Sequence, residues 1–440
     1  MSARGPGPNP AASAGFPAAP PRRPPRSLRA NVAWTFAGNV IYAGCQWLML
    51  MAVAKLGTRE MVGEFSYALA LTAPVSVLTS LQLRYVQATD ARDHFPFSSY
   101  LGLRLLGAAF SLVIVAALAA LAPEKGVGAV VLTIGVAKAI EAVSDICYGL
   151  LQRHERMDRI ARSMIFRGVT ASAAFTVVVG ITGTVAAGGI ALCVTWGLVL
   201  VLHDLPRTSA LLGSGRATAW PRPTFGPADL SQLTRRALPL GAMAFLLSLG
   251  INIPRYFIER SLGLTELGVF SAVSYIVVAL SMVLAALGQA AMPRMAVHHA
   301  RGEQSAFLRL TFFLGGLGVA LGLAAAVVAA VAGQPLLALL YRPEYAAAQP
   351  VFLWTALGST LGLASSALGY SLTATGSFRA QAPLAVAVLG TTATTCWLLI
   401  PRFGLLGAVA AVAIASLAQL VGHVLLIRAE LRRGLLTRLP

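Results

Sequence analysis

Long stretches without a charged residue recur along the chain, and short charged segments separate them. These stretches run from 30 to 54, 105 to 123, 168 to 202, 237 to 254, 267 to 293, 310 to 341, 345 to 378, 380 to 401 and 403 to 427. A helix needs about 20 apolar residues to cross a hydrocarbon core of about 30 Å. Because nearly every stretch reaches that length, the pattern predicts a series of membrane-spanning helices.

One long stretch that must be divided and two apolar segments that contain charges complete the set of predicted spans. The stretch from 168 to 202 is too long for one helix and has a turn-like middle between Gly180 and Gly189, so we divide it into two spans. The segments 61–83 and 127–151 are apolar enough to span the membrane despite internal charges. The chain lacks the alternation of apolar and polar residues that barrel strands require. The pattern therefore predicts an all-α membrane protein with twelve transmembrane helices.

A motif that occurs twice divides these helices into two lobes. LGTREMVGEFSY (56–67) follows the first span, and LGLTELGVFS (262–271) follows the seventh. Six spans in each half make both halves enter the membrane from the same side, as parallel repeats about a pseudo-two-fold axis. We expect a cytoplasmic tail (1–29), a first lobe (30–212), a cytoplasmic linker (213–236), a second lobe (237–430) and a cytoplasmic C-terminal tail (431–440). The N-terminal tail is rich in proline and arginine and lacks acidic residues, which predicts disorder.

The basic residues agree with this topology. Most of the 34 lysines and arginines fall in segments that it places in the cytoplasm, among them Arg167 and the arginines at 153, 156, 159 and 162. Lys138 lies inside a span, and the outer segments hold Lys55, Arg59, Lys125, Arg255, Arg260, Arg342 and Arg402. Such an excess of basic residues on one side is typical of cytoplasmic loops. Both termini are therefore expected in the cytoplasm.

The composition changes the interpretation of the net charge of +18. Hydrophobic residues make up 57% of the chain and charged residues 11%, whereas a soluble domain carries about 25% charged residues. A soluble enzyme or a nucleic-acid-binding module is excluded on this ground. The basic surplus indicates membrane topology, and we expect contact with membrane lipids and none with nucleic acid.

Several segments along the chain carry a family resemblance: residues 56–75, YGLLQRHERMDRIARSMIFRG (148–168), LPLG with NIPRYFIERSLG (238–263), YRPEY (341–345), LTATG (372–376) and PRFGLLG (401–407). In their order and spacing they resemble the polysaccharide transporters, or lipid-linked oligosaccharide flippases, of the multidrug/oligosaccharidyl-lipid/polysaccharide superfamily. The resemblance implies a MATE-like fold in a bacterial inner membrane. It further implies that the chain moves an isoprenoid-diphosphate-linked oligosaccharide from the cytoplasmic to the outer leaflet, in association with polysaccharide synthesis enzymes.

Polar residues inside the expected spans are the candidates for a transport cavity. Three sets occur at positions i, i+3 and i+7, which lie on one face of a helix: Asn39, Tyr42 and Gln46; Lys138, Glu141 and Asp145; and Asn252, Arg255 and Glu259. Charged groups within a membrane usually face a cavity or a charged partner. We expect a central cavity between the two lobes.

Basic residues are the expected partners of a diphosphate, since a guanidinium donates hydrogen bonds in pairs to phosphate oxygens. The candidates for substrate binding are Arg255, Lys138, Arg84 and Arg104, with the amides of Asn39, Gln46 and Asn252. Alternatively, Lys138 and Glu141 neutralise each other. Arg84 and Arg104 are then anchors in the headgroup region, and the amides join helices.

Acidic residues in the spans are candidates for ion coupling: Glu141, Asp145 and Glu259. The chain has no GxxxxGK[ST] motif for binding ATP, and its cysteines and histidines show no metal-ligand spacing. We therefore expect no cofactor and no metal. An ion gradient, the membrane potential or consumption of the product would supply the energy.

Three other functions remain open. A drug antiporter of the same superfamily would have a cavity dominated by acids. A membrane glycosyltransferase or polymerase would need acidic motifs and a large loop on the outer side, where the chain has only isolated acids such as Glu60, Glu124 and Glu344. A structural scaffold would leave the intramembrane charges without a role. We favour a flippase, and not an enzyme.

Overall fold

The computed structural model describes residues 28–90, 94–122, 124–212 and 221–436. In the first half of the chain the elements are α1 (Leu28–Leu56), α2 (Arg59–Ser80), α3 (Leu83–Thr89), α4 (Phe97–Ala120), α5 (Lys125–Arg153), α6 (Met157–Thr182), α7 (Val185–Val199), the π-helical segment η1 (Leu200–Asp204) and α8 (Leu205–Leu211). The second half holds α9 (Pro227–Leu262), α10 (Leu264–Arg301), α11 (Gln304–Leu340), the 3₁₀ segment η2 (Pro343–Ala348), α12 (Gln349–Ala374) and α13 (Phe378–Leu436).

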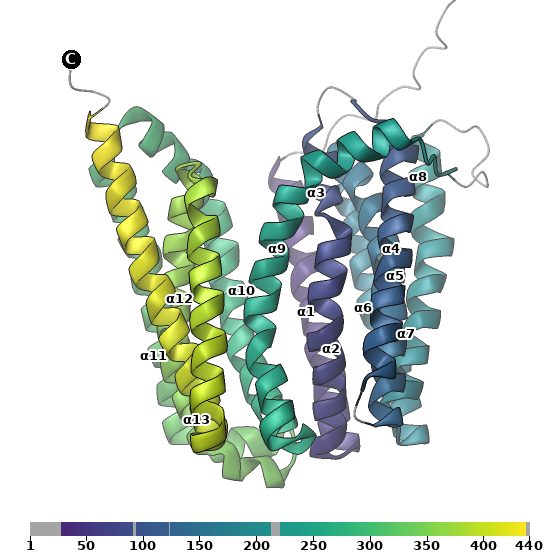
Figure 1. Cartoon of the computed structure of the whole chain (residues 1–440), viewed down its shortest axis with the longest axis vertical. Helices are drawn as coiled ribbons and strands as arrows, with labels where there is room; N and C mark the ends of the chain where they lie inside the picture. The colour runs from purple at the N-terminus through teal and green to yellow at the C-terminus, as the bar shows by residue number, and fades with distance from the viewer. Residues whose placement is uncertain (1–27, 91–93, 123, 213–220, 437–440) are drawn as a thin grey trace, which may run out of the picture.

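The helices confirm the predicted fold class. In the described part of the chain, 11 helices are long and apolar enough to cross a membrane. One of them, α13, is two helices joined at a reversal of the chain, where Gly404 has φ 57° and ψ −137°. Its two arms run side by side in Figure 1, and they coincide with the two predicted spans 380–401 and 403–427. With α13 divided in this way, the twelve predicted spans are accounted for.

The two copies of the repeated motif meet in the structure. A Cβ atom added at Gly63 of α2 would lie 2.0 Å from the carbonyl oxygen of Leu264, and one added at Gly268 of α10 would lie 2.0 Å from that of Arg59. Gly63 and Gly268 occupy equivalent places in the two copies, so each copy makes the same contact with the other. Such a reciprocal contact is what a two-fold relation requires.

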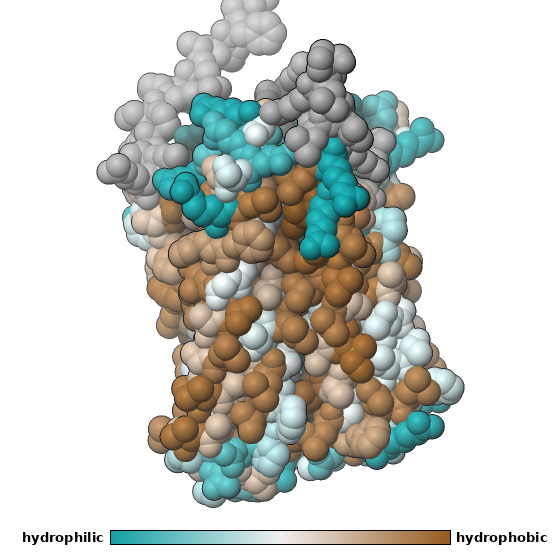
Figure 2. All heavy atoms as spheres, turned by 90° about the vertical axis from the view of Figure 1, so that its left-hand side faces the viewer, coloured by the Kyte–Doolittle hydropathy of each residue, from teal (hydrophilic) through white to brown (hydrophobic). Residues whose placement is uncertain are grey.

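The first described helix begins, and the last one ends, on one side of the membrane region. The start of α1 and the end of α13 lie at the upper end of the molecule in Figure 1, which we call the terminal end. The contacts of Gly63 and Gly268 lie at the other, opposite end. Figure 2 shows a broad apolar band between polar residues that gather at both ends. Exposed side chains such as Phe312, Val331 and Trp397 belong to the apolar surface, which the acyl chains of a bilayer would cover.

Two helices begin earlier than the charge pattern predicts. We expected Arg167 in a cytoplasmic segment, but α6 starts at Met157 and makes this arginine part of a spanning helix. Likewise α9 starts at Pro227, inside the segment expected as the linker 213–236, and its first turns lie across the terminal end in Figure 1. Residues 1–27, 213–220 and 437–440 lie outside the described residues, so the two tails and the lobe boundaries stay predictions.

A small polar cluster joins α3 to α4 at the terminal end. His94 lies 2.7 Å from the Asp90 carboxylate through Nδ1, and Tyr100 donates a hydrogen bond to Asp90 at 3.2 Å. Burial acts to raise the pKa of the Asp90 carboxyl, but hydrogen bonds from His94, Tyr100 and the backbone of Phe95 outweigh burial and hold its pKa below the usual value. The fold therefore favours the ionised form of Asp90.

The lowered pKa makes this connection sensitive to acid. A carboxyl with a depressed pKa stabilises the fold fully above its unfolded pKa, and the stabilisation is lost as pH falls through the folded pKa. We expect hydrogen exchange at the amides of 94–100, corrected for intrinsic rates, to be slower in the wild type than in Asp90→Asn near neutral pH. The difference should persist down to about pH 4 and be lost only as the pH falls further, through the lowered pKa of Asp90. Equal protection of the two proteins at neutral pH would contradict this assignment.

Candidate functional site

A polar cavity of about 190 Å³ opens among the helices of the first half of the chain. It is lined by Tyr42, Ser76, Val77, Ser80, Arg84, Arg104, Lys138, Glu141, Ala142, Asp145, Tyr148, Met164 and Arg167. These residues belong to α1, α2, α3, α4, α5 and α6. By the rise of α5, Lys138 lies about 20 Å and Asp145 about 30 Å from the opposite end. The cavity therefore extends from the middle of the membrane region towards the terminal end.

One face of α5 supplies the centre of the cavity. Lys138, Glu141 and Asp145 all line it, as the spacing i, i+3 and i+7 predicts for residues on one helical face. Tyr148 lies three residues further along the same face and also lines the cavity. A single stripe on α5 thus presents a basic, two acidic and an aromatic group in turn along the cavity wall.

A kink between helices α2 and α3 brings Arg84 to this wall. α2 ends at Ser80 and α3 begins at Leu83, because Leu81 and Gln82 have φ values of 50° and 52°. Left-handed backbone is uncommon for residues other than glycine and persists only where the surroundings stabilise it. The kink redirects the chain next to Ser80 and Arg84, both of which line the cavity.

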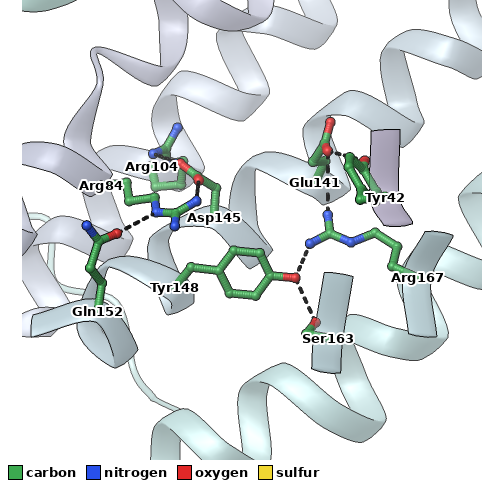
Figure 3. A network of polar contacts seen from close by, with 9 residues as sticks. All are labelled: Tyr42, Arg84, Arg104, Glu141, Asp145, Tyr148, Gln152, Ser163 and Arg167. Atoms are coloured by element: carbon green, nitrogen blue, oxygen red, sulfur yellow. Dashed lines mark hydrogen bonds and ion pairs between the residues drawn. The ribbon is translucent and has the colours of Figure 1, made fainter. Parts of the chain in front are cut away.

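Asp145 joins two arginines at one end of the cavity. Its carboxylate lies 3.2 Å from Nη1 of Arg84 and 3.1 Å from Nη2 of Arg104. Arg84 also donates through Nε to Gln152 at 3.0 Å, and its guanidinium lies 5.5 Å from the ring centre of Tyr148. Figure 3 shows this group on one side of Tyr148. Asp145 therefore holds both arginines at the cavity.

Glu141 organises the other side of Tyr148. Its carboxylate lies 2.8 Å from Nζ of Lys138, accepts a hydrogen bond from the Tyr42 hydroxyl at 2.5 Å and lies 3.8 Å from Nη1 of Arg167. Nη2 of Arg167 donates a hydrogen bond to the Tyr148 hydroxyl, as Figure 3 shows. Lys138 and Glu141 pair, as one of the two sequence interpretations allowed, but the pair is part of a larger network that includes Arg167.

The cavity has an excess of positive charge and unused hydrogen-bond donors. It contains four basic side chains, Arg84, Arg104, Lys138 and Arg167, against the carboxylates of Glu141 and Asp145. Arg104 is 1% and Arg167 2% exposed. Nε and Nη1 of Arg104 and Nε of Arg167 have no hydrogen-bond partner among the described residues. A buried donor without a partner costs about 1–3 kcal/mol, so the site is suited to an anion that accepts these bonds.

Of the residues expected to bind substrate, the structure brings Arg84, Arg104 and Lys138 together at this cavity. The sequence interpretation of Arg84 and Arg104 as anchors exposed to headgroups does not fit Arg104, which is buried on Asp145. Gln46 lies within hydrogen-bonding reach of Tyr42, next to the cavity. Asn39 is exposed on α1.

The polar face predicted on α9 does not reach this cavity. Nη1 of Arg255 donates to the carbonyl of Ile251 at 3.1 Å and to Oδ1 of Asn252 at 3.2 Å. Glu259 hydrogen-bonds with Tyr67 of α2. None of the cavity-lining residues comes from α9 or from any later element. The described cavity thus lies within the first half of the chain, while the central cavity expected between the two lobes stays a prediction.

Sequence reasoning missed Arg167 and Tyr148 as cavity residues. The place of Arg167 in a spanning helix was not recognised, because four other arginines precede it and the whole segment therefore resembled a cytoplasmic loop. Its position four residues after Ser163, on the same face of α6, was the available signal. Tyr148 continues the stripe of Lys138, Glu141 and Asp145 by three residues, and extending that pattern would have found it.

Comparison with known proteins agrees with the fold and the sequence motifs. The family model described as "Polysaccharide biosynthesis protein" matches residues 28–299. The capsular polysaccharide biosynthesis protein CapF of Staphylococcus aureus is 24% identical over 399 residues, which cover 89% of this chain and 97% of CapF.

Solved structures of transporters share the arrangement of helices. The lipid II flippase MurJ, in an inward closed conformation, superimposes with a TM-score of 0.70 at 9% identity, covering 92% of this chain and 90% of MurJ. An inward-facing multidrug resistance MATE transporter of the MOP superfamily gives 0.66 at 14% identity, covering 91% of this chain and 96% of that one. The fold is that of the MOP superfamily of membrane transporters, and the chain belongs to the polysaccharide biosynthesis protein family.

Proposed function

We propose that this protein is a flippase that moves an isoprenoid-diphosphate-linked oligosaccharide across the bacterial inner membrane. The observation that carries the proposal is the cavity, in which two nitrogens of the buried Arg104 guanidinium have no hydrogen-bond partner within the described residues. A diphosphate offers several oxygens that accept paired hydrogen bonds from a guanidinium. Such a headgroup would also balance the excess of basic over acidic side chains.

The distribution of contacts between the two halves supports alternating access. At the opposite end, Lys55 of α1 donates to the carbonyl of Leu339 at 2.6 Å, and Arg342 donates to the carbonyl of Gly57 at 2.7 Å. Each cation therefore binds the C-terminal end of a helix of the other half, where the helix dipole favours positive charge. These bonds would have to break for the headgroup to leave at that end.

The basic residues support one orientation in the membrane. We infer that the terminal end faces the cytoplasm, because most lysines and arginines lie in segments expected at that end, as is typical of cytoplasmic loops. The cavity would then receive its headgroup from the cytoplasmic leaflet. Membrane lipids and enzymes that synthesise the lipid-linked glycan are the partners this role implies.

We further propose that the chain transports its substrate without chemical change. Catalysis on a glycan would need acidic groups gathered at the outer side. Glu344 lies there at 3.9 Å from both Arg59 and Arg342, and so acts as an ion-pair partner. The acids of the cavity, Glu141 and Asp145, are each bound to basic residues as well.

An antiporter of organic cations is the second candidate, since transporters described as multidrug MATE proteins share the fold. Its cavity would have to present a free carboxylate to a cation. In this cavity Asp145 contacts two arginines and Glu141 contacts Lys138 and Arg167. The arrangement therefore favours an anionic ligand over a cationic one.

Binding of a probe by the purified protein tests the choice. Farnesyl diphosphate in detergent micelles should bind the wild type, and Arg104→Gln should weaken binding about tenfold or more, because a hydrogen bond to a charged group contributes about 1.5–3 kcal/mol. Arg255→Gln is the matched control, since it removes an intramembrane arginine outside the cavity, and it should bind like the wild type. Binding of ethidium, but not of farnesyl diphosphate, would instead support the antiporter.

A further inference from the structure

A chain of hydrogen bonds leads from Arg167 away from the cavity into the protein. Arg167 donates to the Tyr148 hydroxyl, which lies 2.6 Å from Oγ of Ser163. Ser163 donates in turn to Oδ1 of Asp204 at 2.5 Å. Figure 3 shows the first part of this chain, with Tyr148 between Arg167 and Ser163. A cavity residue is thus connected to a carboxylate that does not itself line the cavity.

The carboxylate of Asp204 is completely buried, and its surroundings leave polar atoms unused. Asp204 is 0% exposed, and its Oδ2 has no hydrogen-bond partner in the part of the chain that the structure describes. His203 lies 3.0 Å away through Nδ1, while Nε2 of the same ring is buried and likewise has no partner among the described residues. Both residues belong to the π-helical segment η1. Such wide turns inside helices are frequent at functional sites.

The groups that face Asp204 come from every element packed around it. They are Cys147 and Tyr148 of α5, Ser163 and Arg167 of α6, His203 of η1, and Arg207 and Thr208 of α8, with Asp158 and Arg162 further out beside Arg207. Thr208 donates its hydroxyl to the backbone carbonyl of Asp204, and Arg207 donates to that of His203. Among the described residues, the basic side chain that contacts the Asp204 carboxylate is His203, through Nδ1 at 3.0 Å.

The direction of the donors ties the chain to the ionised form of Asp204. An arginine can only donate, so the Tyr148 oxygen accepts from Arg167. Ser163 uses its hydrogen for Asp204, so Tyr148 must donate its own to Ser163. All donors then point towards Asp204, and a negative charge at the end strengthens every bond of the chain. A proton on Asp204 would remove that charge and weaken the hold of Tyr148 on Arg167.

We propose that Asp204, together with His203, is a proton-binding site that controls the position of Arg167 in the cavity. The inference rests on the proposed function, because it assigns the regulation of the same anion site. Ionised Asp204 holds Arg167 on Tyr148, and protonation releases the guanidinium towards the bound anion. The proton and the anion therefore bind together, which couples the loading of the cavity to protonation.

The site differs from the acidic residues that the sequence suggested for ion coupling. Glu141 and Asp145 each contact two basic side chains in the cavity, and Glu259 lies away from it beside Tyr67. Asp204 has no lysine or arginine in an ion pair among the described residues, and its close basic neighbour is the imidazole ring of His203. The carboxylate of Asp204 is thus able to take up a proton, whereas the other acids are held by fixed positive charges.

Trp196 reports the position of Arg167 without any ligand. The guanidinium of Arg167 lies 5.6 Å from the ring centre of Trp196. Protein labelled with 5-fluorotryptophan should show a ¹⁹F resonance of Trp196, assigned from Trp196→Phe, that shifts as the pH is changed. Asp204→Asn should abolish this titration, because the amide cannot ionise. Ser163→Ala should abolish it too, since it cuts the chain but keeps the carboxylate.

Asp158→Asn is the matched control, because Asp158 is a buried acid of α6 that does not belong to the series of hydrogen bonds from Arg167 to Asp204. It should keep the titration of the wild type. A titration of Trp196 that survives in both Asp204→Asn and Ser163→Ala would overturn the proposal. Because the two variants change different residues, failure of one of them to fold leaves the other to decide.

A second measurement separates this inference from the proposed function. The affinity of the wild type for farnesyl diphosphate should fall by up to about tenfold per unit of rising pH relative to Asp204→Asn, as for the uptake of one proton. At high pH the variant should bind more tightly than the wild type. If the wild type does not bind the probe at any pH, the proposed function is wrong, while the ligand-free titration of Trp196 still decides on the proton site.

Discussion

Replacing Arg167 with glutamine is expected to reduce glycan export by about 100-fold or more. The side chain bridges Glu141 and Tyr148 at the cavity, and removing one partner of a buried ion pair costs about 3–5 kcal/mol. Part of that loss falls directly on the headgroup, which would lose a guanidinium donor. The measurement is surface polysaccharide in cells that depend on this protein, together with the lipid-linked intermediate that should accumulate inside.

Two further variants test whether the loss of export comes from the guanidinium of Arg167: a conservative substitution at the same position and a control at a distant arginine. Arg167→Lys keeps the charge but lacks the planar set of donors, so it should restore only part of the export. Arg260→Gln removes an exposed arginine at the opposite end and should leave export unchanged. The amount of protein in the membrane is compared for all variants. Normal export by Arg167→Gln at wild-type protein levels would contradict the role of this cavity.

Adding one methyl group at Gly63 is expected to prevent closure of the opposite end. Its Cβ atom would lie 2.0 Å from the carbonyl oxygen of Leu264, and backbone atoms cannot turn away as a side chain can. Overpacking of this kind costs about 1–3 kcal/mol, which shifts the balance between closed and open states by about 5- to 150-fold. Export should fall, because alternation requires both states.

The closure can be measured with a buried reporter. Ala272 of α10 is 0% exposed, and its carbonyl accepts a hydrogen bond from Tyr341 at 2.8 Å. Ala272→Cys should react slowly with a membrane-impermeant thiol reagent added from outside, and much faster when Gly63→Ala is also present. Gly316→Ala is the matched control, since a Cβ atom at Gly316 meets nothing within 4 Å. Equal labelling of the reporter with Gly63→Ala and with Gly316→Ala would refute the steric account.

The sequence predicts the helices well because charge is so costly inside a membrane. The uncharged stretches lie in helices, and the two spans on either side of Arg402 correspond to the two helices of α13, which meet at the non-helical Gly404. The start of α6 was misplaced for the same reason. A run of arginines normally lies in water, and only tertiary partners such as Tyr148 and Glu141 make Arg167 stable within a helix.

The candidate site was predicted in part. Helical periodicity placed Lys138, Glu141 and Asp145 on one face of α5, and that face lines the cavity. Periodicity along one helix does not say which neighbouring helix that face meets. The face of Asn252 and Arg255 has the same spacing, yet Arg255 bonds to its own helix. Partners from distant parts of the sequence decide between these outcomes.

Translocation by the purified protein in liposomes tests the central claim most directly. The substrate is a fluorescent isoprenoid-diphosphate oligosaccharide in one leaflet, and its movement is followed by an impermeant quencher. We predict that the wild type moves the label between leaflets and that Arg104→Gln, with its buried guanidinium removed, moves it at least about tenfold more slowly. Equal rates for the wild type and Arg104→Gln, or for the wild type and empty liposomes, would contradict the account.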